Sequence, residues 1–149
     1  MASRPQTTDG KNSDRMAASL KAEGNAAFKA GCYKDALAKY AGALEASGGG
    51  DDDGELQAVL HANRAACFLK VGEPQQAADA ATLALAGDGY HAKALFRRAQ
   101  AHEALSQPAK AIRDLRVLLR VDPKNRAAVQ HLRLLRARGA RRRRHRGGG

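Results

Sequence analysis

Two pairs of polar residues in this sequence have the spacing of neighbours on one face of a helix. Lys21 and Asn25 are four residues apart, and so are Lys93 and Arg97, a separation that puts both side chains of a pair on the same side of an α-helix. A third segment contributes Asn63. Lys and Arg donate charge-assisted hydrogen bonds to carboxylates, and an Asn amide donates without adding positive charge. Together these residue types suit a site that binds carboxylates.

An internal repeat would place these residues on equivalent elements. Gly24, Ala65 and Ala99 are each followed by Ala twelve residues later, and by Ala or Leu seven residues after that. The second and third anchors are 34 residues apart, and the first two are 41 apart. The seven extra residues match the length of the loop 48–54. A period of 34 with small residues where helices cross is typical of the tetratricopeptide repeat. The matching positions are Ala36, Ala77 and Ala111, then Ala43, Ala84 and Leu118.

The repeat predicts an all-α fold, a right-handed superhelical solenoid of three helix-turn-helix repeats plus a C-terminal capping helix. Stacking is needed because one helix pair cannot bury its own apolar face. Turn signals fall at Gly31, Gly72 and Ser106, and Pro74 and Pro108 suit the first turn of a helix. We expect repeats over about 17–46, 58–91 and 92–125. The expected helices are about 14–30, 33–46, 55–70, 74–86, 91–105, 108–121 and 124–138.

Charge is distributed unevenly along the chain. The 149 residues carry a formal net charge of +11. Residues 124–149 hold ten Lys and Arg and no Asp or Glu, which leaves sixteen basic and fifteen acidic residues over 1–123. The high net charge therefore belongs to the C-terminus. We expect a disordered N-terminus over 1–13, a repeat domain over 14–138 and a disordered Arg/Gly tail over 139–149.

The segments around the candidate residues resemble the carboxylate-clamp tetratricopeptide domains. They read Leu20–Asn25, His61–Ala66 and Ala92–Arg98. The resemblance implies a co-chaperone or adaptor whose groove binds the C-terminal Glu-Glu-Val-Asp tail of Hsp90, Hsp70 or both. It also implies which side chains hold the tail's terminal carboxylate and last Asp. The alternative is that these side chains are solvated polar residues of a generic repeat scaffold. The five implied clamp residues are Lys21, Asn25, Asn63, Lys93 and Arg97.

Other segments are similar to the N-terminal domain of UCS-type myosin chaperones. They are Ala58–Cys67, Lys93–Ala101 and Asp122–Asn125. Clamp proteins of the mitochondrial import pathway are similar in the same segments. Members of the UCS family carry a large armadillo-type client-binding region after this domain, and this sequence does not contain one. The resemblance therefore implies the chaperone-docking half alone.

Three further residues are candidates for secondary contacts in the groove. Phe28 and Phe68 would suit a pocket for the apolar residue before the final Asp of the tail, and both would also suit the core. Arg98 would reach acidic residues further upstream in the tail, or lie on an exposed helix face. The sequence leaves both alternatives open for each residue.

The Arg-rich tail has several interpretations. It is a solvated end, a nuclear or nucleolar address, or a weak nucleic-acid contact through phosphate electrostatics. It lacks interleaved aromatic residues on which bases would stack. It could also attract acidic peptides without specificity. The alternative function for the whole chain is thus a repeat scaffold with a basic tail that acts in nuclear targeting or weak RNA binding. The tail arginines are Arg141, Arg142, Arg143, Arg144 and Arg146.

Other function classes find no support in the sequence. No catalytic arrangement or phosphate-binding Gly loop is present, so we expect no enzyme and no cofactor. Five scattered His and two Cys lack the spacing of a metal site. Cys32 falls at a turn and Cys67 in an apolar stretch, so we expect reduced thiols and a cytoplasmic protein, with a nuclear location left open. No apolar run is long enough to cross a membrane, and we expect a monomer.

Overall fold

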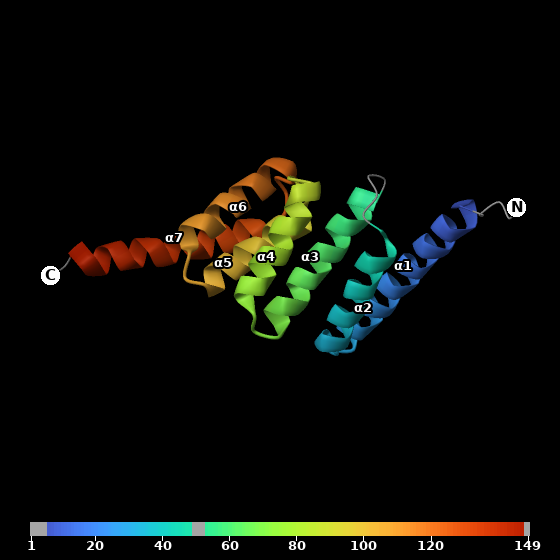
Figure 1. The fold of residues 1–149 in the computed structure, drawn as a ribbon. Coiled ribbons are helices and arrows are strands. Elements are labelled where there is room, and N and C mark those ends of the chain that lie inside the picture. The colour runs from blue at the N-terminus through green and yellow to red at the C-terminus, as the bar shows by residue number, and fades with distance from the viewer. Residues whose placement is uncertain (1–5, 49–52, 148–149) are drawn as a thin grey trace, which may run out of the picture.

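The computed structural model describes residues 6–48 and 53–147. Within these ranges the chain forms α-helices and no strand. Parts of three predicted segments lie outside the described residues: positions 1–5 of the N-terminus, 49–52 of the Gly/Asp loop and 148–149 of the tail. Helices α2 to α6 begin and end within one residue of the predicted bounds. The helices are α1 (Gln6–Lys29), α2 (Tyr33–Ala46), α3 (Gly54–Lys70), α4 (Pro74–Gly87), α5 (Ala92–Ala104), α6 (Pro108–Val121) and α7 (Arg126–Gly147) (Figure 1).

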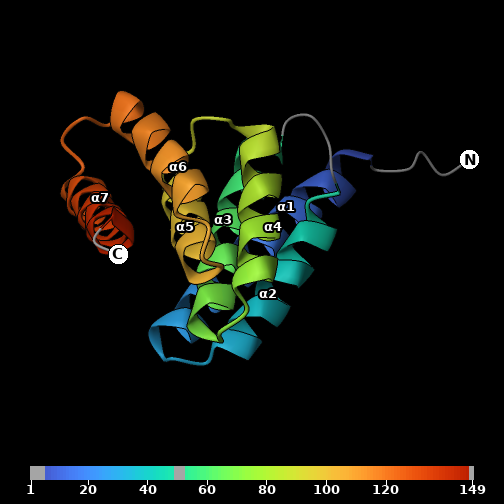
Figure 2. The same ribbon diagram turned by 90° about the vertical axis from the view of Figure 1, so that its left-hand side faces the viewer.

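The helices pack as consecutive pairs. Helix α1 contacts α2, α3 contacts α4, and α5 contacts α6. The pairs follow one another along the molecule (Figure 1), and α7 lies beside the last pair (Figure 2). Helix α3 also contacts α5, the corresponding helix of the next pair. The predicted all-α arrangement of three helix pairs and a terminal helix is confirmed.

Small residues let the paired helices approach one another closely. A Cβ atom added to Gly24 on α1 would lie 2.6 Å from Cε1 of Tyr40 on α2, so the Tyr40 ring packs directly against the backbone of α1. Larger side chains such as Leu60 and Leu115 fill the space around the crossings. The repeat positions predicted from the spacing are all fully buried, namely Ala36, Ala43, Ala65, Ala77, Ala84, Ala99, Ala111 and Leu118.

The turn inside each repeat has the same backbone conformation. Gly31 and Gly72 have φ angles of 81° and 79°, in the left-handed region that glycine adopts without steric cost. The third turn places Ser106 at the same point, with φ of 58°. The predicted turns are therefore confirmed, and the third one holds a residue with a Cβ in a strained conformation.

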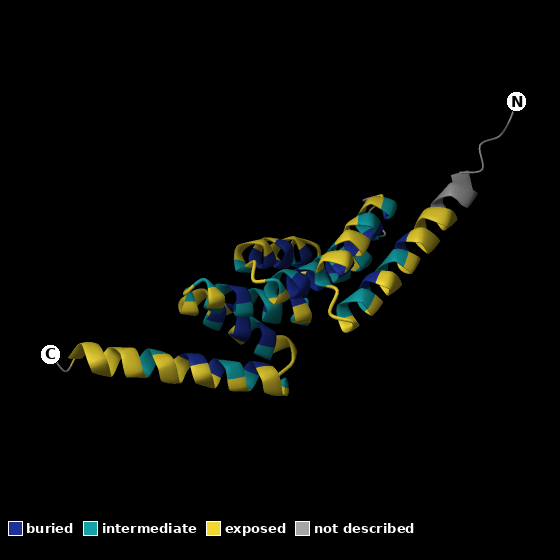
Figure 3. Ribbon diagram, turned by 90° about the horizontal axis from the view of Figure 1, so that it is seen from below, coloured by how far each residue is buried: buried dark blue, intermediate teal, exposed yellow. Residues whose placement is uncertain are grey.

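Both terminal helices differ from the prediction. Helix α1 begins at Gln6, inside the segment 1–13 expected to be disordered, and α7 runs to Gly147 through most of the expected tail. Ala and Arg favour helix without help from a core, and residues 141–147 are exposed along α7 (Figure 3). Helix α7 begins at Arg126, not at 124, because Asn125 Oδ1 accepts a hydrogen bond from the backbone N–H of Ala128 and caps the helix.

Candidate functional site

One groove brings together all five residues predicted for the clamp. It has a volume of about 360 Å³ and lies between α1, α3 and α5, with Tyr40 of α2 at its wall. Helix α1 contributes a face spaced by four residues, and α5 does the same. We call this surface the clamp groove. Its lining residues are Lys21, Asn25, Phe28, Lys29, Tyr40, Val59, Asn63, Ala66, Lys93 and Arg97.

A chain of hydrogen bonds crosses the clamp groove from α2 to α5. The Tyr40 hydroxyl donates to Asn25 Oδ1 at 2.6 Å, and Asn63 Nδ2 donates to the same oxygen at 3.4 Å. Lys93 Nζ donates to Asn63 Oδ1 at 2.6 Å. Both amide oxygens therefore accept bonds from within the protein. The Asn25 amide group and the remaining protons of Lys93 stay available as donors to an incoming acceptor.

The Tyr40 hydroxyl, the first donor of this hydrogen-bond network, remains protonated over a wide pH range. Tyr40 is almost fully buried, and burial raises the pKa of its hydroxyl to about 12. It therefore stays protonated at physiological pH and can donate to Asn25. The close contact of its ring with Gly24 fixes where the hydroxyl lies. Gly24, which lets α1 and α2 pack closely, thus also positions the Tyr40 side chain in the groove.

The cations of the groove have no acidic partner among the residues that the structure describes. Lys21, Lys93 and Arg97 form no ion pair within residues 6–48 and 53–147. Burial lowers the pKa of the Lys93 ammonium, and the charges of Arg97 and Lys21 lower it further. Burial also lowers the pKa of the Arg97 guanidinium. The groove therefore concentrates positive charge at a cost in free energy that a bound anion would offset.

Arg97 also has a donor that nothing in the described chain accepts. Its Nη1 donates to Gln100 Oε1 at 3.0 Å, but its buried Nε has no hydrogen-bond partner. A buried donor without an acceptor is unfavourable. A carboxylate placed in the groove would supply the missing acceptor, so the geometry suits the chemistry expected from the sequence.

The thiol next to the groove belongs to the core. Cys67 is fully buried on α3, and burial raises its pKa to about 11, although Lys93 and Arg64 act in the opposite direction. The thiol therefore stays protonated and packs as a small apolar group. The predicted core position of Cys67 is confirmed, while Cys32 is exposed at the turn before α2.

The three secondary candidates lie in three different surroundings. Phe28 lines the clamp groove and meets Tyr33 edge to face at 5.3 Å between ring centroids. Phe68 instead packs against buried alanines between α3 and α4, away from the groove lining.

Arg98 serves the fold and does not line the groove. Its Nε and Nη2 donate to the two carboxylate oxygens of Asp114 at 2.8 and 2.7 Å, and its Nη1 donates to Thr82. This bidentate pair ties α5 to α6 because Asp114 is buried there and needs a cation. Arg98 is therefore not among the residues that line the clamp groove, although its neighbour Arg97 is, because neighbouring residues on a helix face different directions.

Four groove residues were not predicted from the sequence. Lys29 continues the spacing of four from Lys21 and Asn25, and Val59 and Ala66 flank Asn63 by four and three residues, so helical spacing alone could have found them. Tyr40 could not be found in this way, because it reaches the groove from the second helix of the pair.

Several other kinds of site are absent from the part of the chain that the structure describes. No group of three or more His, Cys, Asp or Glu gathers there in a way that could hold a metal ion. None of the described helices combines the length and the apolar character needed to cross a membrane.

Known proteins are similar to this chain over most of its length. Protein unc-45 homolog B of Xenopus tropicalis is 40% identical over 113 residues, which is 76% of this chain and 12% of that protein. This match is of the kind expected from the resemblance to UCS-type myosin chaperones. The chain spans between about an eighth and a quarter of the length of the first curated relatives that it matches. No protein-family model matches the chain.

Solved structures are similar to this chain in fold. The second TPR domain of human RPAP3, in complex with the HSP70 peptide SGPTIEEVD, is 32% identical with a TM-score of 0.74, over 83% of this chain and 98% of that one. The first TPR domain of Spaghetti (RPAP3), bound to the HSP90 peptide SRMEEVD, is 29% identical with a TM-score of 0.77, over 85% and 95%. These similarities cover almost the whole of each solved domain.

Proposed function

This chain belongs to the tetratricopeptide-repeat domains, and from that premise we propose that its clamp groove binds the acidic C-terminal tail, ending in Glu-Glu-Val-Asp, of an Hsp90 or Hsp70 chaperone. The observation that carries the proposal is the meeting of five predicted side chains from three separate helices in one groove. Similar domains have been solved with peptides of this ending, SRMEEVD and SGPTIEEVD. The chain would then act as an adaptor or co-chaperone without catalytic activity.

The residue types match the two carboxylates of a C-terminal Asp. Lys93 and Arg97 supply charged donors with unused N–H groups, and Lys21 adds a third cation at the α1 side. The amides of Asn25 and Asn63 donate to carboxylate oxygens without further repulsion among the cations. The main-chain carboxylate and the Asp side chain lie close together on one residue, so a compact set of donors can hold both.

The apolar part of the groove suits the residue before the final Asp. Phe28, Val59 and Ala66 line the same groove as the cations. A valine side chain placed against them would leave water and add about 1.5–3 kcal/mol if fully buried. We therefore assign these three residues to the contact with the penultimate residue of the tail.

The remaining properties follow from such a partner. All five clamp residues come from a single chain, so one monomer is sufficient for binding. A chaperone partner of this kind places the domain in the cytoplasm. The chain matches only a small part of its longest relatives, and the proposal therefore concerns the docking step and no client.

Isothermal titration calorimetry tests the proposal. The peptide SRMEEVD with a free C-terminus should bind with micromolar affinity, equivalent to about −8 kcal/mol. The same peptide with an amidated C-terminus should bind at least about tenfold more weakly, because one of its two terminal carboxylates is lost. Equal affinity for the free and the amidated peptides would refute the carboxylate clamp.

A further inference from the structure

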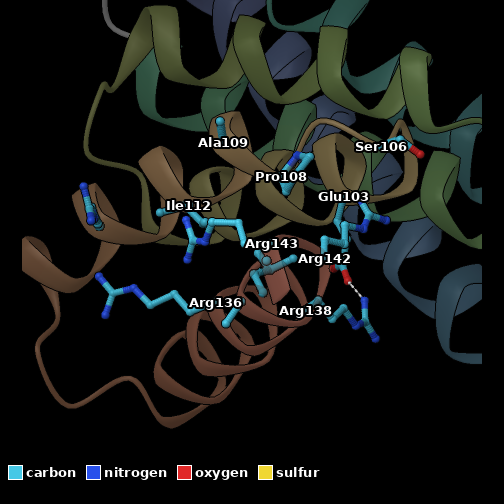
Figure 4. A pocket seen from close by; sticks show the side chains of 13 residues that line it. Glu103, Ser106, Pro108, Ala109, Ile112, Arg136, Arg138, Arg142 and Arg143 are labelled. Carbon is cyan, nitrogen blue, oxygen red and sulfur yellow. Dashed lines mark hydrogen bonds and ion pairs between the residues drawn. The ribbon is translucent and has the colours of Figure 1, made fainter. Parts of the chain in front are cut away.

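A second groove lies at the opposite end of the helix stack from the first repeat. It runs between the turn that joins α5 to α6, the outer side of α6, and α7, and it has a volume of about 710 Å³ (Figure 4). None of its lining residues is shared with the clamp groove. Arginines gather along it from α6 and α7, namely Arg116, Arg136, Arg138, Arg142 and Arg143. We call this surface the arginine groove.

Most of this positive charge is uncompensated. Glu103 is the acidic residue in the lining, and it is already paired, since Arg138 Nη1 donates to its Oε1 at 2.6 Å and His131 contacts its other oxygen. Arg116, Arg136, Arg142 and Arg143 form no ion pair with any carboxylate in the described ranges. The groove therefore offers four exposed guanidinium groups to an anionic ligand.

The C-terminal end of α7, which carries Arg142 and Arg143, is not stabilised by packing against the rest of the fold. Residues 141–147 are exposed, and most helices depend on packing of one face for their stability. Like charges three or four residues apart, such as those of Arg138, Arg142 and Arg146, repel one another. Negative charge laid along this stretch would remove that repulsion, so an acidic partner would stabilise the helix as it binds.

The floor of the groove is apolar. Its lining includes Pro108, Ala109 and Ile112 of α6 and the buried Leu135 of α7, and Ile112 packs against the core cluster to which Leu135 belongs. Figure 4 shows arginine side chains of α7 beside these α6 residues. The wall at Gly139 is open, because a Cβ atom added there would meet nothing within 4 Å. A ligand that fits must therefore combine negative charge with small or medium apolar groups.

We propose that the arginine groove docks an acidic segment of a partner protein in which Glu or Asp alternates with aliphatic side chains. Such a segment would place carboxylates on Arg136, Arg142 and Arg143 and aliphatic groups on the floor. RNA fits less well, because the lining contains no aromatic ring for base stacking. The site needs no free C-terminus, so it can bind internal segments that the clamp groove does not accept.

The test compares two double variants that change the charge equally. R142E/R143E reverses two arginines that line the groove, whereas R141E/R144E reverses two on the same helix that do not line it. The probe is a fluorescent peptide that alternates Glu and Leu, with an amidated C-terminus that excludes the clamp groove. Fluorescence anisotropy measures its affinity for the full chain, and circular dichroism checks that both variants remain helical.

We expect R142E/R143E to lower the affinity for the probe by about tenfold or more, and R141E/R144E to lower it by clearly less. It also expects a polyglutamate peptide of equal charge to bind more weakly than the probe. Equal losses in the two variants, or equal binding of polyglutamate or of polyuridine RNA, would overturn the proposal, since the tail would then attract any polyanion by bulk charge.

A single substitution provides an independent check. Ala109 is exposed at the first turn of α6, where a carboxylate interacts favourably with the helix dipole. Ala109→Glu should therefore leave the thermal midpoint unchanged or higher, while the new negative charge weakens the alternating probe severalfold. Unchanged affinity for the probe in this variant would contradict binding at the floor of the groove.

Discussion

The two grooves of this molecule are both basic, but they hold their charges in different ways. In the clamp groove, the Lys93 ammonium is bonded to Asn63, which is itself bonded to Asn25, and Asn25 accepts a bond from the buried Tyr40. In the arginine groove, Arg142 and Arg143 are exposed on a helix that lies beyond the core. The charge of Lys93 is therefore held by a network of hydrogen bonds, whereas the charges of Arg142 and Arg143 lie on exposed side chains at the end of α7.

This difference predicts two kinds of recognition. Donors held in one geometry by burial and hydrogen bonds can distinguish a terminal carboxylate from other anions, because no reorganisation is needed when it binds. Exposed guanidinium groups on long side chains accept many arrangements of negative charge and are screened by salt. We expect the clamp groove to select a chain end and the arginine groove to select a composition.

The largest expected effect comes from removing a fixed cation. Lys93→Ala and Arg97→Ala should each weaken the SRMEEVD peptide by about 2 kcal/mol, or roughly thirtyfold, since each deletes a charge-assisted hydrogen bond to a partly buried carboxylate. Neither should affect the alternating probe of the arginine groove. Calorimetry of both ligands measures this, with Lys110→Ala as a control cation that lines neither groove.

Tyr40→Phe tests whether the hydrogen bond from Tyr40 to Asn25 contributes to peptide binding in the clamp groove. The hydroxyl bonds to Asn25, so its loss should release that amide and weaken the SRMEEVD peptide by about 1 kcal/mol. The free energy of unfolding should fall by a similar amount, because Asn25 Oδ1 loses its stronger donor. If peptide affinity stays at the wild-type value while stability falls, Tyr40 has a structural role only.

The pH dependence distinguishes the grooves further. A bound carboxylate favours the charged form of Lys93, so the affinity of the clamp groove should fall as the pH rises through the pKa of Lys93. Burial, Arg97 and Lys21 lower that pKa below its usual value of 10.5, so the loss should begin at a lower pH than for an exposed lysine. The arginine groove should keep its affinity over the same range, because guanidinium groups stay charged. Calorimetry across alkaline pH measures the difference, and Lys93→Arg is the variant that removes the titration of residue 93.

The clamp groove could be predicted from the sequence largely because helical repeats convert spacing into position. Lys21 and Asn25, or Lys93 and Arg97, share a face whenever a helix forms, and the period of 34 residues aligns those faces. Tyr40 was not predicted as a groove residue because its position depends on the close contact with Gly24, which is a property of the packed pair and not of either helix.

The arginine groove could not be predicted in the same way. The run Arg141–Arg144 is consistent with disorder by composition, and only the extension of α7 to Gly147 gives it a fixed face. That extension depends on helix propensity, which is a weak determinant compared with core packing. The ion pair of Arg98 could not be predicted either, since the sequence does not reveal that Asp114 is buried opposite it.

The smallest expected effect comes from Ser106→Gly, a substitution that changes the stability of the fold without changing any charge. Ser106 lies at the rim of the arginine groove with φ of 58°, where the equivalent turns have Gly31 and Gly72. Ser106→Gly should relieve this strain and raise the free energy of unfolding by about 0.5–1 kcal/mol, which denaturant unfolding can measure. Since no charge changes, the affinities of both grooves should stay the same. A gain in stability accompanied by weaker binding of the alternating probe would mean that the strained turn shapes the arginine groove, and that this groove is less mobile than its exposed side chains suggest.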